Sequence, residues 1–178
     1  MRNSKVKGFT LIELIVVIAI IGVLAAILVP SMLGYVRNAR ISQANANAKQ
    51  VHTAVSSALT QLGISNYAFG TTPTTGDPAV QVELDGSQIK CTFTNCNDPG
   101  SDSMDLISYL GENFKGVGKA YFNKATYSVY AAAWANNTTD LGKAGDNKDA
   151  YVNKTEQQQK ADAKNGNIYG IFPAPTLS

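Results

Sequence analysis

The sequence predicts an α+β fold in which one long N-terminal helix packs against a C-terminal antiparallel sheet. Two observations lead to this prediction. An apolar run that ends at Val29 is followed by a segment in which apolar residues recur with the helical period. Beyond residue 64, short alternating segments are separated by turn-forming Gly, Pro, Asn and Asp residues. A chain of 178 residues leaves room for one modest domain beside such a helix.

The first half of the predicted helix is long and apolar enough to span a membrane. Residues 9–29 would form a helix of about 31 Å at ~1.5 Å per residue, close to the ~30 Å of a hydrocarbon core. Arg2, Lys5 and Lys7 precede this segment and favour a cytoplasmic N-terminus. The chain after residue 30 is therefore expected outside the cytoplasm.

Glu13 is the one charged residue inside this apolar segment. An ionisable side chain in a spanning helix costs roughly 2.5–3.5 kcal/mol, so it requires a partner or a function. No partner is apparent from the sequence. Cleavage of the chain just before Phe9 would create an α-amino group, with a pKa of about 8, near the start of the helix.

The heptapeptide KGFTLIE, residues 7–13, resembles the processing site of type IV prepilins and the related pseudopilins. The resemblance implies that a prepilin peptidase and methyltransferase cuts the chain after Gly8 and N-methylates Phe9. It also implies that Glu13 takes part in subunit registration during assembly. The family fold is a long N-terminal helix covered by an antiparallel sheet, as the residue pattern predicts.

Gly22 and Pro30 fall where members of this family carry a helix-weakening pair. The resemblance implies that the helix between them partly unwinds in the fibre. The residue chemistry agrees, because Gly costs about 1 kcal/mol in a helix interior and Pro removes a backbone donor and kinks the helix.

The resemblance also implies where the protein resides and what it contacts. Before assembly the chain would cross the inner membrane once, and afterwards it would lie in an extracellular fibre, a homopolymer formed through the N-terminal helices. A membrane assembly platform and its ATPase would drive polymerisation. Removing residues 1–8 leaves 12 basic and 13 acidic residues, a net charge of −1. This near-neutral balance does not argue for a general nucleic-acid-binding surface, so any DNA binding is expected to be local.

The apolar N-terminal segment and the role of the chain within the family each allow alternative interpretations. A secretory signal peptide has a shorter apolar core without an acid, and a plain signal anchor would not need Glu13. Within the family, the chain could be a pilus subunit, a pseudopilin of a type II secretion or DNA-uptake system, or a minor adhesive pilin. The uses that correspond to these roles are twitching motility, cell adhesion, DNA uptake and protein secretion.

The chain is predicted to divide into a leader (1–8), a transmembrane and assembly half of the helix (9–30), an amphipathic half (31–63) and a globular sheet domain (64–178). Gly63 is the expected C-cap of the helix, and His52 is expected to be solvated on its polar face. The apolar face of the second half comprises Leu33, Val36, Ala44, Ala48, Val51, Val55, Ala58, Leu59 and Leu62.

The globular domain is predicted to begin with a loop over 67–78. The elements expected after it are a hairpin of 79–84 and 87–93 around a turn at Asp85-Gly86, a helix over 102–114, two strands within 119–135, a polar loop over 136–154, a capped helix from Thr155 to Asn165-Gly166, and a strand over 167–172. Val80, Val82, Leu84 and Trp134 are predicted core residues.

Cys91 and Cys96 are expected to form a disulfide, because they follow the predicted membrane span and would lie in an oxidising compartment. A disulfide that closes so short a loop would mainly hold a turn in place. A zinc site is the weaker alternative, since further Cys or His ligands are missing. Many members of the resembled family tie the C-terminal segment to the sheet with a disulfide. In this chain that segment must be held by strand pairing and packing.

No catalytic set and no cofactor are predicted, and the chain is not expected to be an enzyme. His52 is the only histidine, and the sequence has no nucleotide-binding glycine pattern. Calcium binding is a minor alternative for two acidic groups whose spacing differs from that of an EF-hand. These groups are Asp98, Asp102 and Asp105, and Asp140, Asp146 and Asp149, while Asn136, Asn137 and Asn153 are candidate glycosylation sites.

Overall fold

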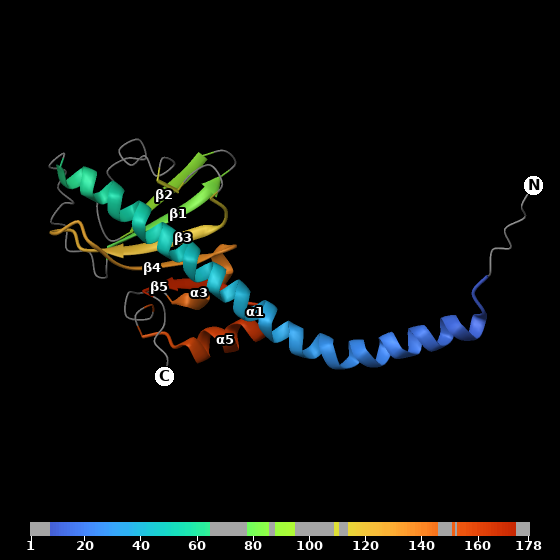
Figure 1. Cartoon of the computed structure of the whole chain (residues 1–178). Coiled ribbons are helices and arrows are strands. Elements are labelled where there is room, and N and C mark those ends of the chain that lie inside the picture. Colours follow the sequence, from blue (N-terminus) through green and yellow to red (C-terminus); the bar gives the residue numbers. More distant parts are fainter. Residues whose placement is uncertain are drawn as a thin grey trace, which may run out of the picture. The chain divides into compact units, whose positions relative to one another are not determined.

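The structure is a computed structural model with two compact units, Met1–Val36 and Arg37–Ser178. The helix α1, Leu11–Ile64, has residues in both units (Figure 1). The described part of the C-terminal unit includes the sheet and the shorter helices α3 (Thr138–Ala144) and α5 (Glu156–Lys164). The structure describes residues 8–64, 78–85, 88–94, 109–110, 114–145, 151 and 153–173.

Five strands form one sheet in the order β2-β1-β3-β4-β5, and every neighbouring pair is antiparallel. The predicted α+β class is therefore confirmed. The final strand is shorter than predicted, because pairing with β4 begins at Tyr169. The strands are β1 (Ala79–Asp85), β2 (Gln88–Thr94), β3 (Val117–Phe122), β4 (Val129–Ala135) and β5 (Tyr169–Phe172).

One face of the sheet packs against the second half of α1. Alternate strand residues such as Val80, Val82 and Trp134 join the same buried cluster as the helix. The approach is close, because a Cβ at Gly118 of β3 would lie 2.6 Å from Val51 Cγ2. The buried helix residues are Ile41, Ala44, Ala48, Val51, Ala54, Val55, Ala58, Leu59 and Leu62.

The predicted apolar face of α1 is thus confirmed from Ala44 onward, while Leu33 and Val36 are exposed. The predicted C-cap at Gly63 is wrong, because α1 continues to Ile64. Helix ends vary by one or two residues, so this difference changes little in the packing.

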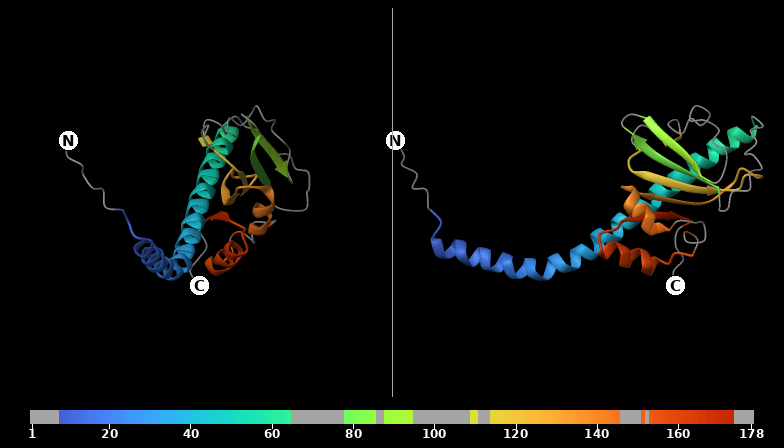
Figure 2. Two further views of the ribbon diagram at one scale, coloured as in Figure 1. Left: turned by 90° about the vertical axis from the view of Figure 1, so that its right-hand side faces the viewer. Right: turned by 180° about the vertical axis from the view of Figure 1, so that it is seen from behind.

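The opposite face of the sheet is covered by a helix that the sequence analysis missed. The predicted loop over 136–154 contains α3, Thr138–Ala144, which places Leu141 and Ala144 in a second buried cluster with Ala131 and Ala133. Asn137 caps the helix by accepting a hydrogen bond from the Asp140 amide. Figure 2 shows α1 and α3 on opposite sides of the sheet.

The remaining predicted elements have mixed outcomes. The capped helix is confirmed as α5, Glu156–Lys164, with a reciprocal capping box between Thr155 and Gln158. The hairpin is confirmed, but Asp85, predicted to lie in the turn, is the last residue of β1 and pairs with Gln88.

Several predictions fall on parts of the chain that the structure does not describe. These include most of the 67–78 loop and of the 102–114 helix, although Tyr109 and Leu110 are helical. The Cys91 backbone belongs to β2, while its side chain and Cys96 lie outside the described residues. The disulfide therefore stays a prediction.

Candidate functional site

The N-terminal unit presents an almost wholly apolar helix surface. An 18-residue window of α1 has a mean hydropathy of 3.2 with none of its surface buried, so length and composition suit a membrane span. Side chains point outward around the helix, including Leu11, Ile18, Ile27 and Met32, all more than half exposed. Such a surface is stable when lipid or other apolar helices cover it.

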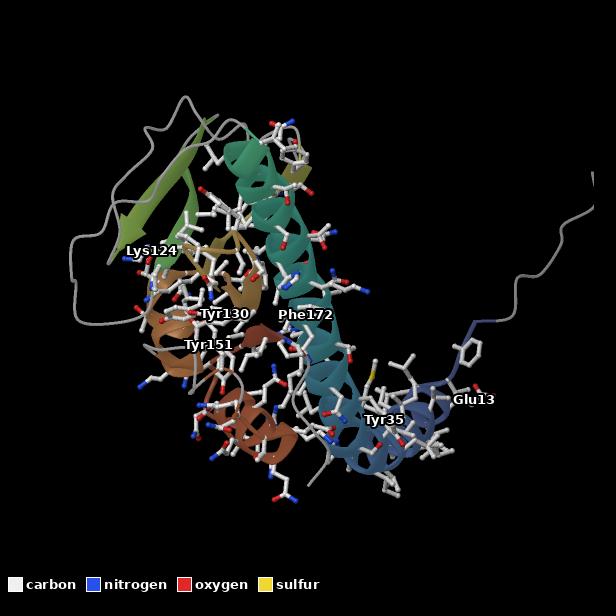
Figure 3. All side chains as sticks on the ribbon, turned by 90° about the vertical axis from the view of Figure 1, so that its left-hand side faces the viewer. Glu13, Tyr35, Lys124, Tyr130, Tyr151 and Phe172 are labelled. Carbon is white, nitrogen blue, oxygen red and sulfur yellow. The ribbon has the colours of Figure 1, made fainter. Side chains whose placement is uncertain are left out.

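Glu13 caps the start of this helix. Its Oε2 accepts hydrogen bonds from the Thr10 amide at 2.9 Å and the Thr10 hydroxyl at 2.6 Å, and its own amide donates to Thr10 Oγ1 at 3.4 Å. This is a reciprocal capping box of the Thr-x-x-Glu type. Glu13, labelled in Figure 3, thus has a partner within the chain, contrary to the sequence analysis. The Thr-x-x-Glu spacing in the sequence could have revealed this capping box.

The residues of the predicted processing site are accessible. Phe9 is 81% exposed, Gly8 is exposed, and both precede the first residue of α1. A peptidase needs an unpaired, extended backbone at its cleavage site, and here no helix hydrogen bond would have to break. Cleavage and methylation themselves stay predictions.

Gly22 and Pro30 lie within α1, which is helical through both positions. No atom beyond its chain neighbours and helix backbone lies within 4 Å of a Cβ built at Gly22. Beside Pro30, the Ser31 hydroxyl donates to the Leu28 carbonyl at 2.9 Å. The unwinding implied for the fibre stays a prediction about the assembled state.

In the C-terminal unit, Asn45 of α1 fastens the last strand. Its Oδ1 accepts from the Ile171 amide at 2.9 Å and from Gln159 Nε2 at 2.8 Å. Gln159 Nε2 also donates to the Tyr169 carbonyl at 2.8 Å. These bonds pair the Ile171 amide and the Tyr169 carbonyl on the outer edge of β5, and they join α1, α5 and β5. Strand pairing with β4 and this network therefore hold the C-terminal segment, as the sequence analysis expected without identifying Asn45.

A second network supports the same strand from the side of α3. Lys154 donates to the Lys143 carbonyl at 2.8 Å, lies 3.5 Å from Asp162 Oδ2, and places its Nζ 5.3 Å from the Tyr169 ring centroid. The Tyr169 hydroxyl donates to Asp162 Oδ2 at 2.5 Å. Burial, together with this bond to a carboxylate, raises the pKa of Tyr169 well above its ordinary range.

His52 is not the solvated residue that the sequence analysis expected. Its ring is half-buried and packs edge-to-face on Phe172, with ring centroids 4.7 Å apart. Nε2 lies 3.1 Å from the Val129 carbonyl oxygen. Burial lowers the pKa of His52, and the bond to Val129 opposes that shift. These contacts give His52 a packing role between α1, β4 and β5.

The described residues contain no group of three or more His, Cys, Asp and Glu side chains that could hold a metal ion. Of the calcium candidates, Asp140 lies in α3, where its carboxylate accepts from Asn137 Nδ2 at 3.2 Å. The other five candidate aspartates lie outside the described residues; they are Asp98, Asp102, Asp105, Asp146 and Asp149. Asn136 and Asn153 are exposed, whereas Asn137 serves as the α3 cap.

Comparison with known proteins identifies the family. Residues 3–29 match the model of the prokaryotic N-terminal methylation motif. A fimbrial protein of Moraxella nonliquefaciens is 51% identical over 118 residues, covering 66% of this chain and 73% of that protein. The chain belongs to the type IV pilin family. A fimbrial protein of Pseudomonas aeruginosa is 44% identical over 113 residues, covering 60% of this chain and 70% of the relative.

Other pilin relatives match over a shorter stretch. The type IV major fimbrial protein of Dichelobacter nodosus is 45% identical over 57 residues, which cover 32% of this chain and 36% of the relative. The chain thus spans about a third of that relative's length. No solved structure matches the chain.

Proposed function

We propose that this pilin is a non-enzymatic structural subunit of an extracellular type IV pilus, polymerised through its hydrophobic N-terminal helix. The observation that carries the proposal is the 51% identity to a fimbrial protein over 73% of that protein's length. The exposed apolar surface of residues 9–36 supports it, because a polymer in which such helices pack together would bury that surface.

The proposed life of the subunit begins in the inner membrane. Residues 9–30 cross the bilayer with the basic leader on the cytoplasmic side, and the peptidase and methyltransferase cuts after Gly8 and methylates the Phe9 amine. The supporting observations are the match of residues 3–29 to the methylation motif and the exposure of Gly8 and Phe9. A membrane platform with its ATPase supplies the work of extraction.

During assembly, Glu13 exchanges one partner for another. In the isolated subunit its carboxylate caps its own helix through Thr10. In the fibre it pairs with the Phe9 amine of a neighbouring copy, a cation–anion contact that the apolar surroundings strengthen. The acid is thus never left in hydrocarbon without a donor. Local unwinding between Gly22 and Pro30 adjusts the helix to its neighbours.

Electron microscopy of sheared surface fibres, followed by mass analysis of their main component, tests the proposal. Long fibres built from this chain, with a mature N-terminus at methylated Phe9, are the expected result. A pseudopilin of a secretion or DNA-uptake system is the alternative. Absence of this chain from long fibres, together with loss of secretion or transformation in a deletion strain, would favour that alternative.

A further inference from the structure

The basic residues of the chain are unevenly distributed by type. Of its 15 basic residues only three are arginines, which are Arg2 before the apolar segment and Arg37 and Arg40 after it. All the others are lysines. The chain therefore uses arginine only at the two ends of the segment proposed to span the membrane, and Arg37 and Arg40 are the arginines that remain once the leader is removed.

Arg37 directly follows the exposed apolar surface of α1. Exposed apolar side chains continue past Pro30 as far as Val36, and Tyr35 is 76% exposed. Residues 9–36 would form about 42 Å of helix at ~1.5 Å per residue, which matches the ~40–45 Å of a bilayer with its headgroup regions. An aromatic residue such as Tyr35 favours that interface. In the proposed membrane stage, the two arginines thus begin at the depth of the outer headgroups.

The two arginines lie one turn apart on the same side of α1. Positions 37 and 40 are helical, and a spacing of three residues brings side chains close together. Arg40 is exposed and Arg37 partly exposed, and neither forms a hydrogen bond or ion pair with any residue that the structure describes. Because two like charges at this spacing repel each other, an anion bound to both would stabilise the helix.

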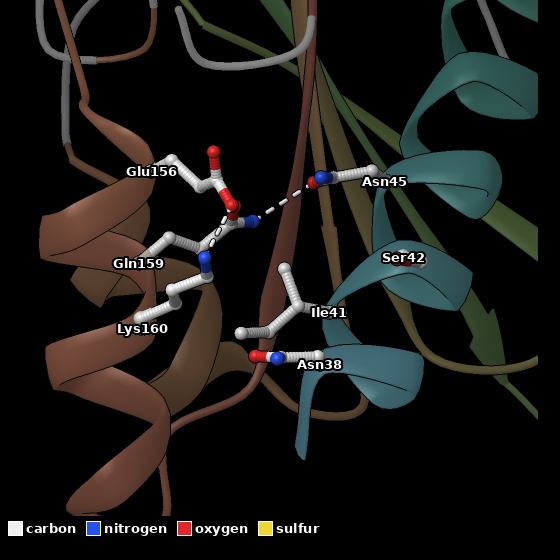
Figure 4. Close-up of a pocket in the computed structure, with 7 residues that line it drawn as sticks. All are labelled: Asn38, Ile41, Ser42, Asn45, Glu156, Gln159 and Lys160. Carbon is white, nitrogen blue, oxygen red and sulfur yellow. Dashed lines mark hydrogen bonds and ion pairs between the residues drawn. The ribbon is translucent and has the colours of Figure 1, made fainter. Parts of the chain in front are cut away.

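The acidic side chains that the structure describes in the C-terminal unit already have partners. Glu156 of α5 and Asn38 of α1 line opposite sides of one groove (Figure 4), and Glu156 Oε1 lies 2.5 Å from Lys160 Nζ. The Asp140 and Asp162 carboxylates accept hydrogen bonds within the same unit. The described part of this unit thus supplies no free carboxylate for the two arginines, which indicates a partner outside the subunit.

The position and type of these residues indicate which anion that partner carries. Basic residues that flank a spanning helix ordinarily collect on its cytoplasmic side, so two arginines on the outer side require a specific reason. The guanidinium presents a planar fork of N–H donors that binds two phosphate oxygens at once, whereas a lysine acts as a point charge. At headgroup depth, the phosphate within reach is that of a phospholipid.

We infer that Arg37 and Arg40 clamp the phosphate group of an anionic phospholipid on the outer face of the membrane before the subunit is assembled. The inference rests on the membrane stage of the proposed function. An anionic lipid suits the site better than a zwitterionic one, because its headgroup carries no cation that competes with the arginines. The clamp holds the waiting subunit at a fixed depth until it is extracted.

Solid-state NMR on the full chain in vesicles tests the contact. The vesicles contain phosphatidylcholine with phosphatidylglycerol as the anionic probe. The chain carries Arg2→Lys, so that ¹³C-labelled arginine marks Arg37 and Arg40 alone. Carbon–phosphorus recoupling should place both Cζ atoms within the distance that a direct hydrogen bond to a lipid phosphate requires. Protease protection measures insertion. A chain that does not insert overturns the membrane stage and the clamp together, and an inserted chain without this contact overturns the clamp alone.

Variants distinguish a clamp from general attraction between charges. In a lipid titration followed by native mass spectrometry, Arg37→Gln with Arg40→Gln should bind phosphatidylglycerol about tenfold more weakly than the native chain. Arg37→Lys with Arg40→Lys keeps the charge but loses the fork, and should bind about threefold more weakly. The matched control, Lys49→Gln with Lys115→Gln, removes the same charge from exposed positions and should bind as the native chain does. Lys49 lies about three helical turns beyond Arg37.

Phosphatidylcholine, inorganic phosphate and a short DNA duplex are the competing probes, and circular dichroism checks that each variant is folded. The inference is overturned if either double arginine variant binds phosphatidylglycerol as the native chain does, or if the lysine control loses as much affinity as the glutamine variant. It is also overturned if phosphatidylcholine or free phosphate binds equally well, or if the duplex binds through the two arginines more tightly than the lipid.

Discussion

Gly170 in β5 lies directly against Ala44 in α1. A Cβ at position 170 would be 1.8 Å from the Ala44 carbonyl oxygen and 2.0 Å from its carbonyl carbon. The contact joins two backbones, so a rotamer change cannot relieve it. Only a residue without a side chain lets the strand approach near enough for the Ile171 amide to reach Asn45. The close approach and the hydrogen-bond network therefore depend on each other.

Gly170→Ala should displace β5 from α1 and lower the free energy of unfolding by about 3 kcal/mol or more, because overpacking against backbone exceeds the usual ~1–3 kcal/mol cost. Gly142→Ala is the matched control. Position 142 lies in α3, and a Cβ built there has no neighbour within 4 Å. That substitution should be neutral or stabilising by up to about 1 kcal/mol. Chemical unfolding followed by circular dichroism measures both, and equal stability of the two variants would contradict the backbone contact.

Asn45→Ala should lower the unfolding free energy by roughly 2 kcal/mol or more, because the Ile171 amide and Gln159 Nε2 both lose an acceptor. Limited proteolysis should release the C-terminal segment earlier than in the native chain. The control is Asn47→Ala, which removes only an exposed bond to Gln43 on the same helix. If proteolysis proceeds at the same rate in both variants, Asn45 does not fasten the strand.

Helical periodicity explains why the covered face of α1 was predictable. Ala44, Ala48, Val51 and Val55 repeat every three or four residues, and the structure buries all of them. Asn45 could not be found in this way. Its partners Gln159 and Ile171 are separated from it by 114 and 126 residues, and a polar residue beside an apolar face ordinarily points to solvent.

The helix α3 escaped prediction for a different reason. It has seven residues and includes Gly142, too short and too poor in apolar residues for a periodic signal. Its N-cap residue, Asn137, also belongs to a candidate N-glycosylation motif. The consequence extends to β4, whose Ala131–Ala135 stretch is buried on both faces because α3 covers one and α1 the other.

The contacts of His52 predict a pH dependence. Its folded-state pKa lies below the unfolded value of about 6.5, because burial disfavours the cation. The folded state then binds fewer protons, so the contribution of His52 to stability is complete above about pH 6.5 and is lost as the pH falls through the lowered pKa. On the same helix, Lys49 places its Nζ 6.0 Å from the centroid of the Phe172 ring, on which His52 also packs.

Unfolding free energies of the native chain and of His52→Gln, measured between pH 8 and pH 4, test this dependence. Gln retains a donor for the Val129 carbonyl but does not titrate, so the native chain should lose more stability on acidification than the variant. Parallel pH profiles for the two proteins would show that His52 titrates alike in the folded and unfolded states.

The variants Thr10→Ala and Glu13→Val separate the two roles proposed for Glu13, which are capping its own helix and pairing with the Phe9 amine of a neighbouring subunit. Thr10→Ala removes the hydroxyl bonds of the helix cap, at a cost of about 1 kcal/mol, but keeps the backbone amide of residue 10 and leaves the carboxylate available to a neighbouring subunit. Glu13→Val removes the carboxylate as well. Both variants should insert into the membrane and be processed after Gly8, since neither changes the basic leader or the cleavage site.

Fibre yield should therefore fall sharply in Glu13→Val and much less in Thr10→Ala. Yield is measured by shearing cells, sedimenting the fibres and immunoblotting, with N-terminal mass analysis of the membrane pool as the processing control. An equal loss of fibres in both variants would mean that the cap, and not contact with a neighbour, is what the acid provides. Undiminished fibres in Glu13→Val would remove the acid from the assembly mechanism, because a valine can neither cap the helix nor pair with the Phe9 amine.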